Sequence, residues 1–113
     1  NTDLNKKFRC KINSFLNGHP ECDAIICFND DLAFSILGIL NHQQRKIPSD
    51  VALVGCDNDQ LCERIEPALS TITSQPLLIA QAAVKRLTEL IDIPHEAPQV
   101  IKVPAKFIKR ETL

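Results

Sequence analysis

The spacing of apolar residues divides the chain into alternating helical and extended segments. Apolar side chains recur every three or four positions in residues 3–17 and again in residues 76–92, which predicts two amphipathic helices. The short run at residues 23–28 has the length and continuous hydrophobicity of a strand buried on both faces of a parallel sheet. Residues 51–56 form a second short run, rich in β-branched side chains, and predict another buried strand.

A third helix is predicted between the two strands, over residues 31–43. Asn29 and Asp30 offer a cap for its start. Its apolar side chains cover about 220° of the circumference, which exceeds the single stripe of a surface helix. We therefore expect it to contact the sheet on one side and, on the other, another part of the chain or a second subunit. Strand, helix and strand with short connections predict a parallel, right-handed βαβ unit and an α/β fold.

The rest of the chain is less regular. Residues 58–67 have no clear periodicity, and residues 69–73 form a β-prone segment that leads into the helix at 76–92. Residues 100–108 are extended but interrupted by Pro104, which predicts an edge strand or a hinge.

Composition and charge exclude several classes of protein. The 113 residues suffice for one small domain, and the net charge of −1 argues against a nucleic-acid-binding surface over the whole chain. No apolar run approaches the roughly 18 residues that span a bilayer, and no secretory signal is present. Because the sequence begins with Asn1 and contains no Met, we expect it to be a piece of a longer protein.

Cysteine and histidine spacing predicts neither a disulfide framework nor a metal site. The cysteines are odd in number and form no CxxC pair, while the three histidines lie far apart. We expect reduced thiols, which favour the cytosol. The five cysteines are Cys10, Cys22, Cys27, Cys56 and Cys62.

Polar residues follow both predicted strands of the βαβ unit. Asn29 and Asp30 come after the first strand, and Asp57, Asn58 and Asp59 come after the second. Ligands of open parallel sheets bind beyond the carboxyl ends of the strands, and neighbouring strands lie about 5 Å apart. A carboxylate and an amide at that separation suit the hydroxyl groups of a sugar or another polyol. The alternative is purely structural, because Asn and Asp are also the common residues of helix caps and turns.

An enzyme is not favoured. The chain has no GxGxxG, Walker or GxSxG motif. Asp30, Asp57 and Asp59 could together hold Mg²⁺, but nothing supplies a nucleophile with a matched base. We therefore predict no catalytic residue, no metal and no cofactor.

Several segments of the chain form a recognisable set. They include the strand that ends in Asn29-Asp30 and the helix that contains Ala33 and Gly38. The others are IPSDV (47–51), VGCDN (54–58), PALSTI (67–72) and PAKFIKRET (104–112). In their order and spacing these segments resemble the ligand-binding core of the LacI/GalR family of bacterial transcriptional regulators.

The resemblance implies a fold and a function. Members of the family are cytoplasmic dimers with a DNA-binding head and a two-subdomain core similar to periplasmic binding proteins. Residues 1–69 and 100–113 would belong to the second subdomain, and the helix at 76–92 to the first. The chain would sense a sugar, phosphosugar or related metabolite and, through subdomain closure, change the affinity of a DNA-binding domain outside this chain for its operator. The alternative is a periplasmic sugar-binding protein of a transporter, which shares the fold.

The resemblance also implies roles for individual residues. Asn29 and Asp57 match residues that hydrogen-bond ligand hydroxyls, and Ser74 falls where many members have a pocket-facing Gln. Cys56 replaces the usual aromatic residue, which implies a smaller pocket wall. The positions expected to support the site are Asp30, Asn58 and Gln75, and those expected to face a dimer partner are Phe34, Leu37 and Ile65.

Overall fold

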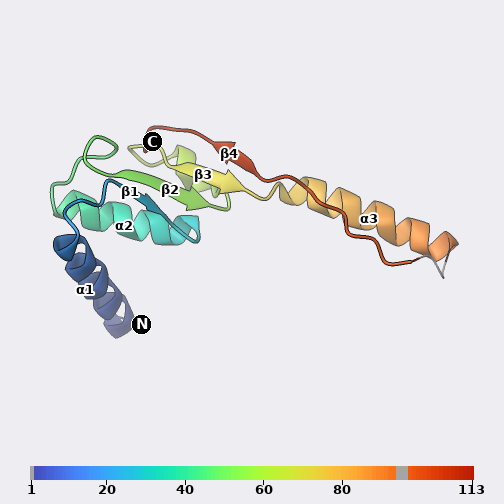
Figure 1. Cartoon of the computed structure of the whole chain (residues 1–113), viewed down its shortest axis with the longest axis horizontal. Helices are drawn as coiled ribbons and strands as arrows, with labels where there is room; N and C mark the ends of the chain where they lie inside the picture. The colour runs from blue at the N-terminus through green and yellow to red at the C-terminus, as the bar shows by residue number, and fades with distance from the viewer. Residues whose placement is uncertain (1, 94–96) are drawn as a thin grey trace.

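Helices and strands alternate along most of the chain (Figure 1). The computed structural model describes residues 2–93 and 97–113. The elements are α1 (Thr2–Gly18), β1 (Ala24–Ile26), α2 (Asp30–His42), β2 (Ala52–Cys56), the 3-10 helix η1 (Gln60–Glu63), β3 (Ser70–Thr73), α3 (Pro76–Asp92) and β4 (Lys106–Ile108).

The strands form one sheet in the order β1-β2-β3-β4. The first three are parallel, with Ile26 opposite Val54 and Cys56 opposite Ile72, and β4 runs antiparallel to β3. The predicted α/β fold with a parallel sheet is therefore confirmed. The extended segment predicted at 100–108 pairs only over Lys106–Ile108, where it forms an edge strand just after Pro104.

The predicted helices agree with the structure to within one residue at each end. The start of α2 shows why: Asn29 caps it, because its side-chain oxygen accepts a hydrogen bond of 2.9 Å from the backbone NH of Leu32. The irregular segment at 58–67 contains only one short turn of 3-10 helix, η1.

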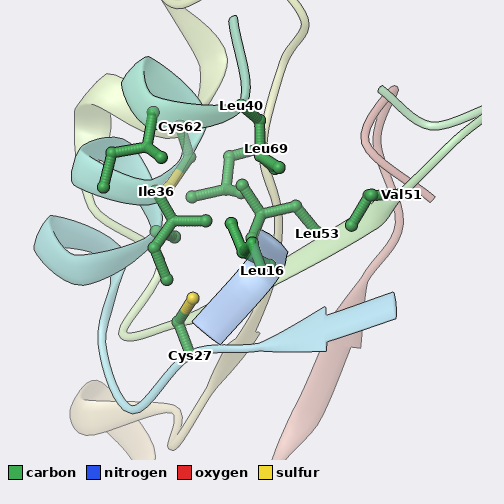
Figure 2. Packing of buried hydrophobic residues seen from close by; sticks show 10 residues of the cluster. Leu16, Cys27, Ile36, Leu40, Val51, Leu53, Cys62 and Leu69 are labelled. Carbon is green, nitrogen blue, oxygen red and sulfur yellow. The ribbon is translucent and has the colours of Figure 1, made fainter. Parts of the chain in front are cut away.

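The hydrophobic core lies between α2 and the sheet (Figure 2). Ile36 and Leu40 of α2 pack with Leu53 of β2 and with Leu69, which precedes β3. Leu16 of α1 joins the same cluster, so α1 covers part of the wide apolar surface of α2. Burial of each such side chain contributes about 1.5–3 kcal/mol to folding.

The prediction that the first strand is buried on both faces is wrong. Side chains alternate along a strand, so Ile25 packs against the core while Ile26 points to the opposite face and is 76% exposed. Phe28 just beyond the strand is 85% exposed. In the described part of the chain β1 is one of the two edge strands, and β2 is its only neighbour in the sheet.

The helix α3 leaves the body of the molecule and has no buried residue among those described (Figure 1). Its apolar stripe, which its amphipathic pattern predicted, is largely exposed, with Val84 at 64% and Leu87 at 61%. The radius of gyration is 19.0 Å, against about 13 Å for a compact domain of this length. Residues 99–103 return alongside α3, and a groove of about 490 Å³ separates the two.

Candidate functional site

Three parallel strands end at one edge of the sheet and bring Asn29, Asp57 and Ser74 to it. Asn29 and Asp57 each follow the paired residues Ile26 and Val54 by three positions, so both lie just beyond the ends of neighbouring parallel strands. Cys56 is opposite Ile72, which places Ser74 just beyond the level of Asp57 on the third strand. The sheet therefore assembles, from separate parts of the sequence, the three side chains predicted to contact a ligand.

The side-chain oxygen of Asn29 caps α2, whereas its side-chain NH₂ remains available to a ligand. Its side-chain oxygen caps α2 through Leu32. The side chain is half-buried, and its amide NH₂ makes no hydrogen bond to any residue that the structure describes. The structural and the ligand-binding interpretations of Asn29 are therefore compatible, because they use different atoms.

Asp57 presents an exposed carboxylate from a tightly held backbone. Its NH donates to the carbonyl of Ile72 over 2.8 Å, which ties the residue to β3. Its φ is 114°, and that of Asn58 is 59°, so two consecutive non-glycine residues adopt positive φ. Such conformations cost about 1–3 kcal/mol each and often occur at functional sites. Within residues 2–93 and 97–113 the carboxylate of Asp57 accepts no hydrogen bond.

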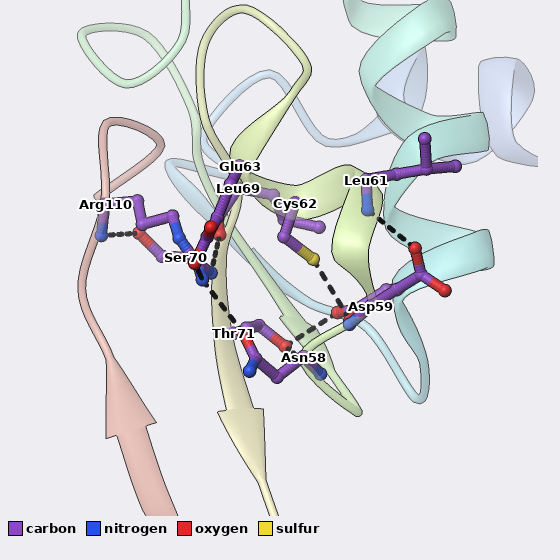
Figure 3. Close-up of polar contacts among 10 residues, drawn as sticks. Asn58, Asp59, Leu61, Cys62, Glu63, Leu69, Ser70, Thr71 and Arg110 are labelled. Carbon is purple, nitrogen blue, oxygen red and sulfur yellow. Dashed lines mark hydrogen bonds and ion pairs between the residues drawn. The ribbon is translucent and has the colours of Figure 1, made fainter.

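Asp30 lies behind this edge and is only 2% exposed. One of its carboxylate oxygens accepts from the hydroxyl of Thr71 over 2.7 Å. The other accepts from the backbone NH of Asp59 over 2.7 Å and from the thiol of Cys62 over 3.2 Å (Figure 3). Asp30 thus joins the start of α2 to β3 and to the loop that carries Asp57, and the positive end of the helix dipole favours its charge.

Burial, assisted by the same carboxylate, keeps two thiols protonated. Burial, together with the hydrogen bond to Asp30, raises the pKa of the Cys62 thiol from 9.0 to about 12. Burial and the nearby charge of Asp30 raise the pKa of Cys27 to about 11. These cysteines are inert packing groups at neutral pH. All five cysteines are free thiols.

The turn from β3 into α3 is fixed by Gln75. This residue has a φ of 57°, and its side-chain NH₂ donates to the carbonyl of Pro104 over 2.7 Å. Gln75 therefore links the outgoing chain to the returning one. Ser74 beside it is exposed.

The residues predicted to face a dimer partner lie at the margin of the core. Phe34, Leu37 and Ile65 are each partly buried against it and keep part of their surface exposed. Their role in an interface stays a prediction.

Sequence reasoning missed Thr71 and Arg110. Thr71 lies 41 positions from its partner Asp30, and Arg110 lies 52 positions from its partner Asn58. Both lie in segments that carry the family resemblance, PALSTI (67–72) and PAKFIKRET (104–112), but nothing local identifies their partners, because these contacts form only when the sheet brings distant segments together.

Metal binding and membrane insertion find no support in the described residues. No group of three or more His, Cys, Asp or Glu side chains in this part of the chain is placed to hold a metal ion. Asp30, one of the three acids considered for Mg²⁺, already accepts three hydrogen bonds. None of the described helices combines the length and the apolar character that a bilayer crossing requires.

Comparison with known proteins identifies close relatives. Residues 3–113 match the family model of the periplasmic binding protein-like domain. The PurR transcriptional repressor of Vibrio campbellii is 29% identical over 90 residues, which cover 80% of this chain and 27% of the repressor. The chain thus spans about a quarter of that relative's length.

Two solved structures share both the fold and appreciable sequence identity. A LacI family transcriptional regulator from Arthrobacter, in complex with lactose, is 31% identical with a TM-score of 0.82, over 92% of this chain and 39% of the other. The ribose operon repressor protein of Lactobacillus acidophilus is 38% identical with a TM-score of 0.77, over 88% and 38% of the two chains. Both are regulators of transcription.

Proposed function

Because this chain belongs to the periplasmic binding protein-like domain of the LacI/GalR family of transcriptional regulators, we propose that it senses a sugar or phosphosugar at the carboxyl edge of its sheet. Ligand binding there would change the affinity of a longer regulator for its operator DNA.

One observation carries the proposal: a free acceptor and a free donor lie just beyond the ends of adjacent parallel strands. The carboxylate of Asp57 can only accept hydrogen bonds, and the amide NH₂ of Asn29 can only donate them. Each follows its member of the pair Ile26 and Val54 by three positions. A strand separation of about 5 Å places the two groups within reach of neighbouring hydroxyls on one sugar ring.

The relatives support a sugar as the ligand. The structure of the Arthrobacter regulator contains bound lactose, and the Lactobacillus protein is named for a ribose operon. Because the relatives described above are regulators, a transporter component is not favoured.

The mechanism is a shift between closure states of two subdomains. A ligand held between them favours one state, and its differential affinity for the two states supplies the allosteric energy. The course of α3, which leads away from the sheet after the turn at Ser74 and Gln75, supports its assignment to the first subdomain. In this proposal operator DNA binds to a domain outside this chain, the regulator works in the cytoplasm, and Phe34, Leu37 and Ile65 contribute to a homodimer.

The test is titration of the whole regulator with lactose, ribose and a wider panel of sugars and phosphosugars. Isothermal titration calorimetry measures binding, and a DNA-binding assay measures operator affinity with and without each compound. We expect at least one compound to bind and to change operator affinity. A regulator whose operator affinity responds to no member of the panel would contradict the proposal.

Replacing the free carboxylate tests the site itself. Asp57→Ala removes the charged acceptor, so affinity for the bound sugar should fall by about 1.5–3 kcal/mol, the range for hydrogen bonds to charged groups. Asp92→Ala is the matched control, because it removes an exposed carboxylate at the far end of α3. Equal sugar affinity in wild type and Asp57→Ala would remove Asp57 from the pocket.

A further inference from the structure

Arg110 binds the loop beyond β2 from the C-terminal segment (Figure 3). Its guanidinium donates to the side-chain oxygen of Asn58 over 2.9 Å and to the carboxylate of Glu63 over 2.8 Å. It also donates to the backbone carbonyl of Leu69 over 2.8 Å. The Arg110 side chain is only 11% exposed, whereas that of Glu63 is 73% exposed, so the arginine is an embedded group and not a mobile surface charge.

These contacts complete a set of three anchors on three consecutive residues. The NH of Asp57 is bound by β3 through Ile72, and the NH of Asp59 is bound by Asp30 at the start of α2. Asn58 lies between them: its NH donates to the hydroxyl of Thr71 over 3.3 Å, and its side chain accepts from Arg110. The turn is therefore held by β3, by the start of α2 and, through the side chain of Asn58, by the C-terminal segment.

The turn needs such anchors because its backbone is strained. Asp57 and Asn58 both have positive φ, and conformations of this kind persist only where the surroundings enforce them. If Asn58 relaxed, the direction of the adjoining Asp57 carboxylate would change, since one peptide unit joins the two residues. The planar guanidinium supplies several donors in fixed directions, which a lysine ammonium cannot reproduce.

We propose that Arg110 is a positioning residue for the ligand site: by holding the side chain of Asn58 it fixes the turn that aims the Asp57 carboxylate. This inference rests on the proposed function for its ligand, and on the hydrogen-bond geometry alone for its effect on the turn.

The experiment compares the wild-type regulator with Arg110→Met, which keeps a long apolar stem but removes every donor. Hydrogen–deuterium exchange reports on the amides of residues 57–59, with residues 33–40 of the core as the internal reference. Titration with lactose and ribose reports on affinity. We expect Arg110→Met to accelerate exchange at residues 57–59 about tenfold and to weaken sugar binding about tenfold, which corresponds to the loss of one coupled contact.

Variants of Asn58 keep the test decisive where Arg110→Met is too unstable to study. Asn58→Ala removes the same contact while Arg110 retains Glu63 and Leu69, so it should reproduce both effects. Asn58→Asp retains an acceptor for Arg110 and should preserve affinity and exchange. Glu63→Ala is the matched control, because it removes another partner of Arg110 without touching Asn58, and sugar affinity should stay unchanged.

The outcomes separate the positioning role from the proposed function. Unchanged exchange at residues 57–59 in both Arg110→Met and Asn58→Ala would overturn the positioning role. So would unchanged sugar affinity in both variants, because a residue with a merely structural role lowers stability without altering the affinity of the folded protein. Faster exchange at residues 57–59, in a regulator that binds neither lactose nor ribose, would support the positioning role and count against the sugar proposal.

Discussion

Asp30 brings a carboxylate into the interior of the domain, where an unpaired charge would be costly. Three donors compensate it: the hydroxyl of Thr71, the backbone NH of Asp59 and the thiol of Cys62. They come from three different segments, so a single side chain holds the edge of the sheet on which the proposed ligand site stands. The structure explains Gly55 in the same way, since a Cβ there would overlap the carboxylate of Asp30.

Gly55→Ala should destabilise the protein. The added methyl group displaces the Asp30 carboxylate from its donors, and overpacking of this kind costs about 1–3 kcal/mol. Urea denaturation followed by circular dichroism measures the change. Gly38→Ala is the control, because nothing lies within 4 Å of its Cβ position, and alanine in the middle of α2 should stabilise by about 0.5–1 kcal/mol. A Gly55→Ala variant as stable as wild type would contradict this account of Asp30.

The buried thiols predict a loss of stability at alkaline pH. Cys27 and Cys62 keep their protons in the folded state up to pKa values of about 11 and about 12, whereas unfolded thiols lose them near 9.0. The two protonated thiols therefore make their full contribution to the free energy of unfolding below pH 9, and this contribution is lost as the pH rises toward the folded pKa values. Each thiol should lower the free energy of unfolding by about 1.4 kcal/mol per pH unit in this range.

Urea denaturation between pH 8 and 10.5 measures this slope. The double variant Cys27→Ala and Cys62→Ser removes both titrations while the serine can still donate to Asp30, so its stability should fall less steeply with pH. If the free energy of unfolding fell equally steeply with pH in the variant and the wild type, the prediction would be contradicted.

Among the elements, the C-terminal segment after β4 joins β2 to β3 at the end of the strands where their pairing begins. The hydroxyl of the buried Thr112 donates to the carbonyl of Leu53 over 2.6 Å and accepts from the NH of Ser70 over 2.8 Å. The backbone carbonyl of Thr112 also accepts from the NH of Leu53 over 2.8 Å. The last residues of the chain thus bridge two strands just before their own pairing begins at Val54 and Ser70.

Thr112→Val should be strongly destabilising although it preserves the shape of the side chain. It leaves the carbonyl of Leu53 and the NH of Ser70 without this bridge, at a cost of about 2–4 kcal/mol. Thr112→Ser keeps the hydroxyl and is the control, because it loses only one methyl group. Chemical denaturation of the three proteins distinguishes them, and equal stability of the valine and serine variants would exclude the bridge as a source of stability.

The molecule as a whole is elongated, with principal extents of 59 × 30 × 25 Å. The sheet and α2 form one body, to which α1 attaches near its C-terminal end, while α3 and the returning segment form an arm (Figure 1). Apolar side chains lie exposed along that arm, and the outer edge of β1 is unpaired in the described chain. Surfaces of this kind favour association.

The 113-residue chain studied alone should therefore self-associate or be poorly stable. Sedimentation velocity over a range of concentrations measures its state. Introducing charges on one stripe of α3, with Val84→Lys and Ile91→Glu, should shift the chain toward the monomer, because both side chains are largely exposed. A monodisperse wild-type monomer that unfolds cooperatively would contradict the expectation.

The helices, the strands and their parallel pairing could be predicted because each depends on neighbours in the sequence. The apolar spacing of residues 3–17 and 76–92 predicts a helix with one apolar side, and this prediction does not depend on what packs against that side. Asn29 and Asp57 could be identified for a related reason: they directly follow apolar runs, and parallel strands end at a common edge. Asp30, by contrast, could be placed only at a helix start, without its buried partners.

Contacts between residues that are distant in the sequence were determined only by the tertiary structure. Periodicity shows that a surface is apolar but not what covers it, so the exposure of Ile26 could not be foreseen. Arg110 and Thr112 lie in the segment PAKFIKRET (104–112), but nothing local identifies their partners, because they meet Asn58 and Leu53 only after the sheet has formed. Local patterns of apolar and polar residues thus specify the elements and the edge at which the proposed site lies. The hydrogen bonds that hold this edge join residues as many as 52 positions apart, and only packing in three dimensions determines which groups meet.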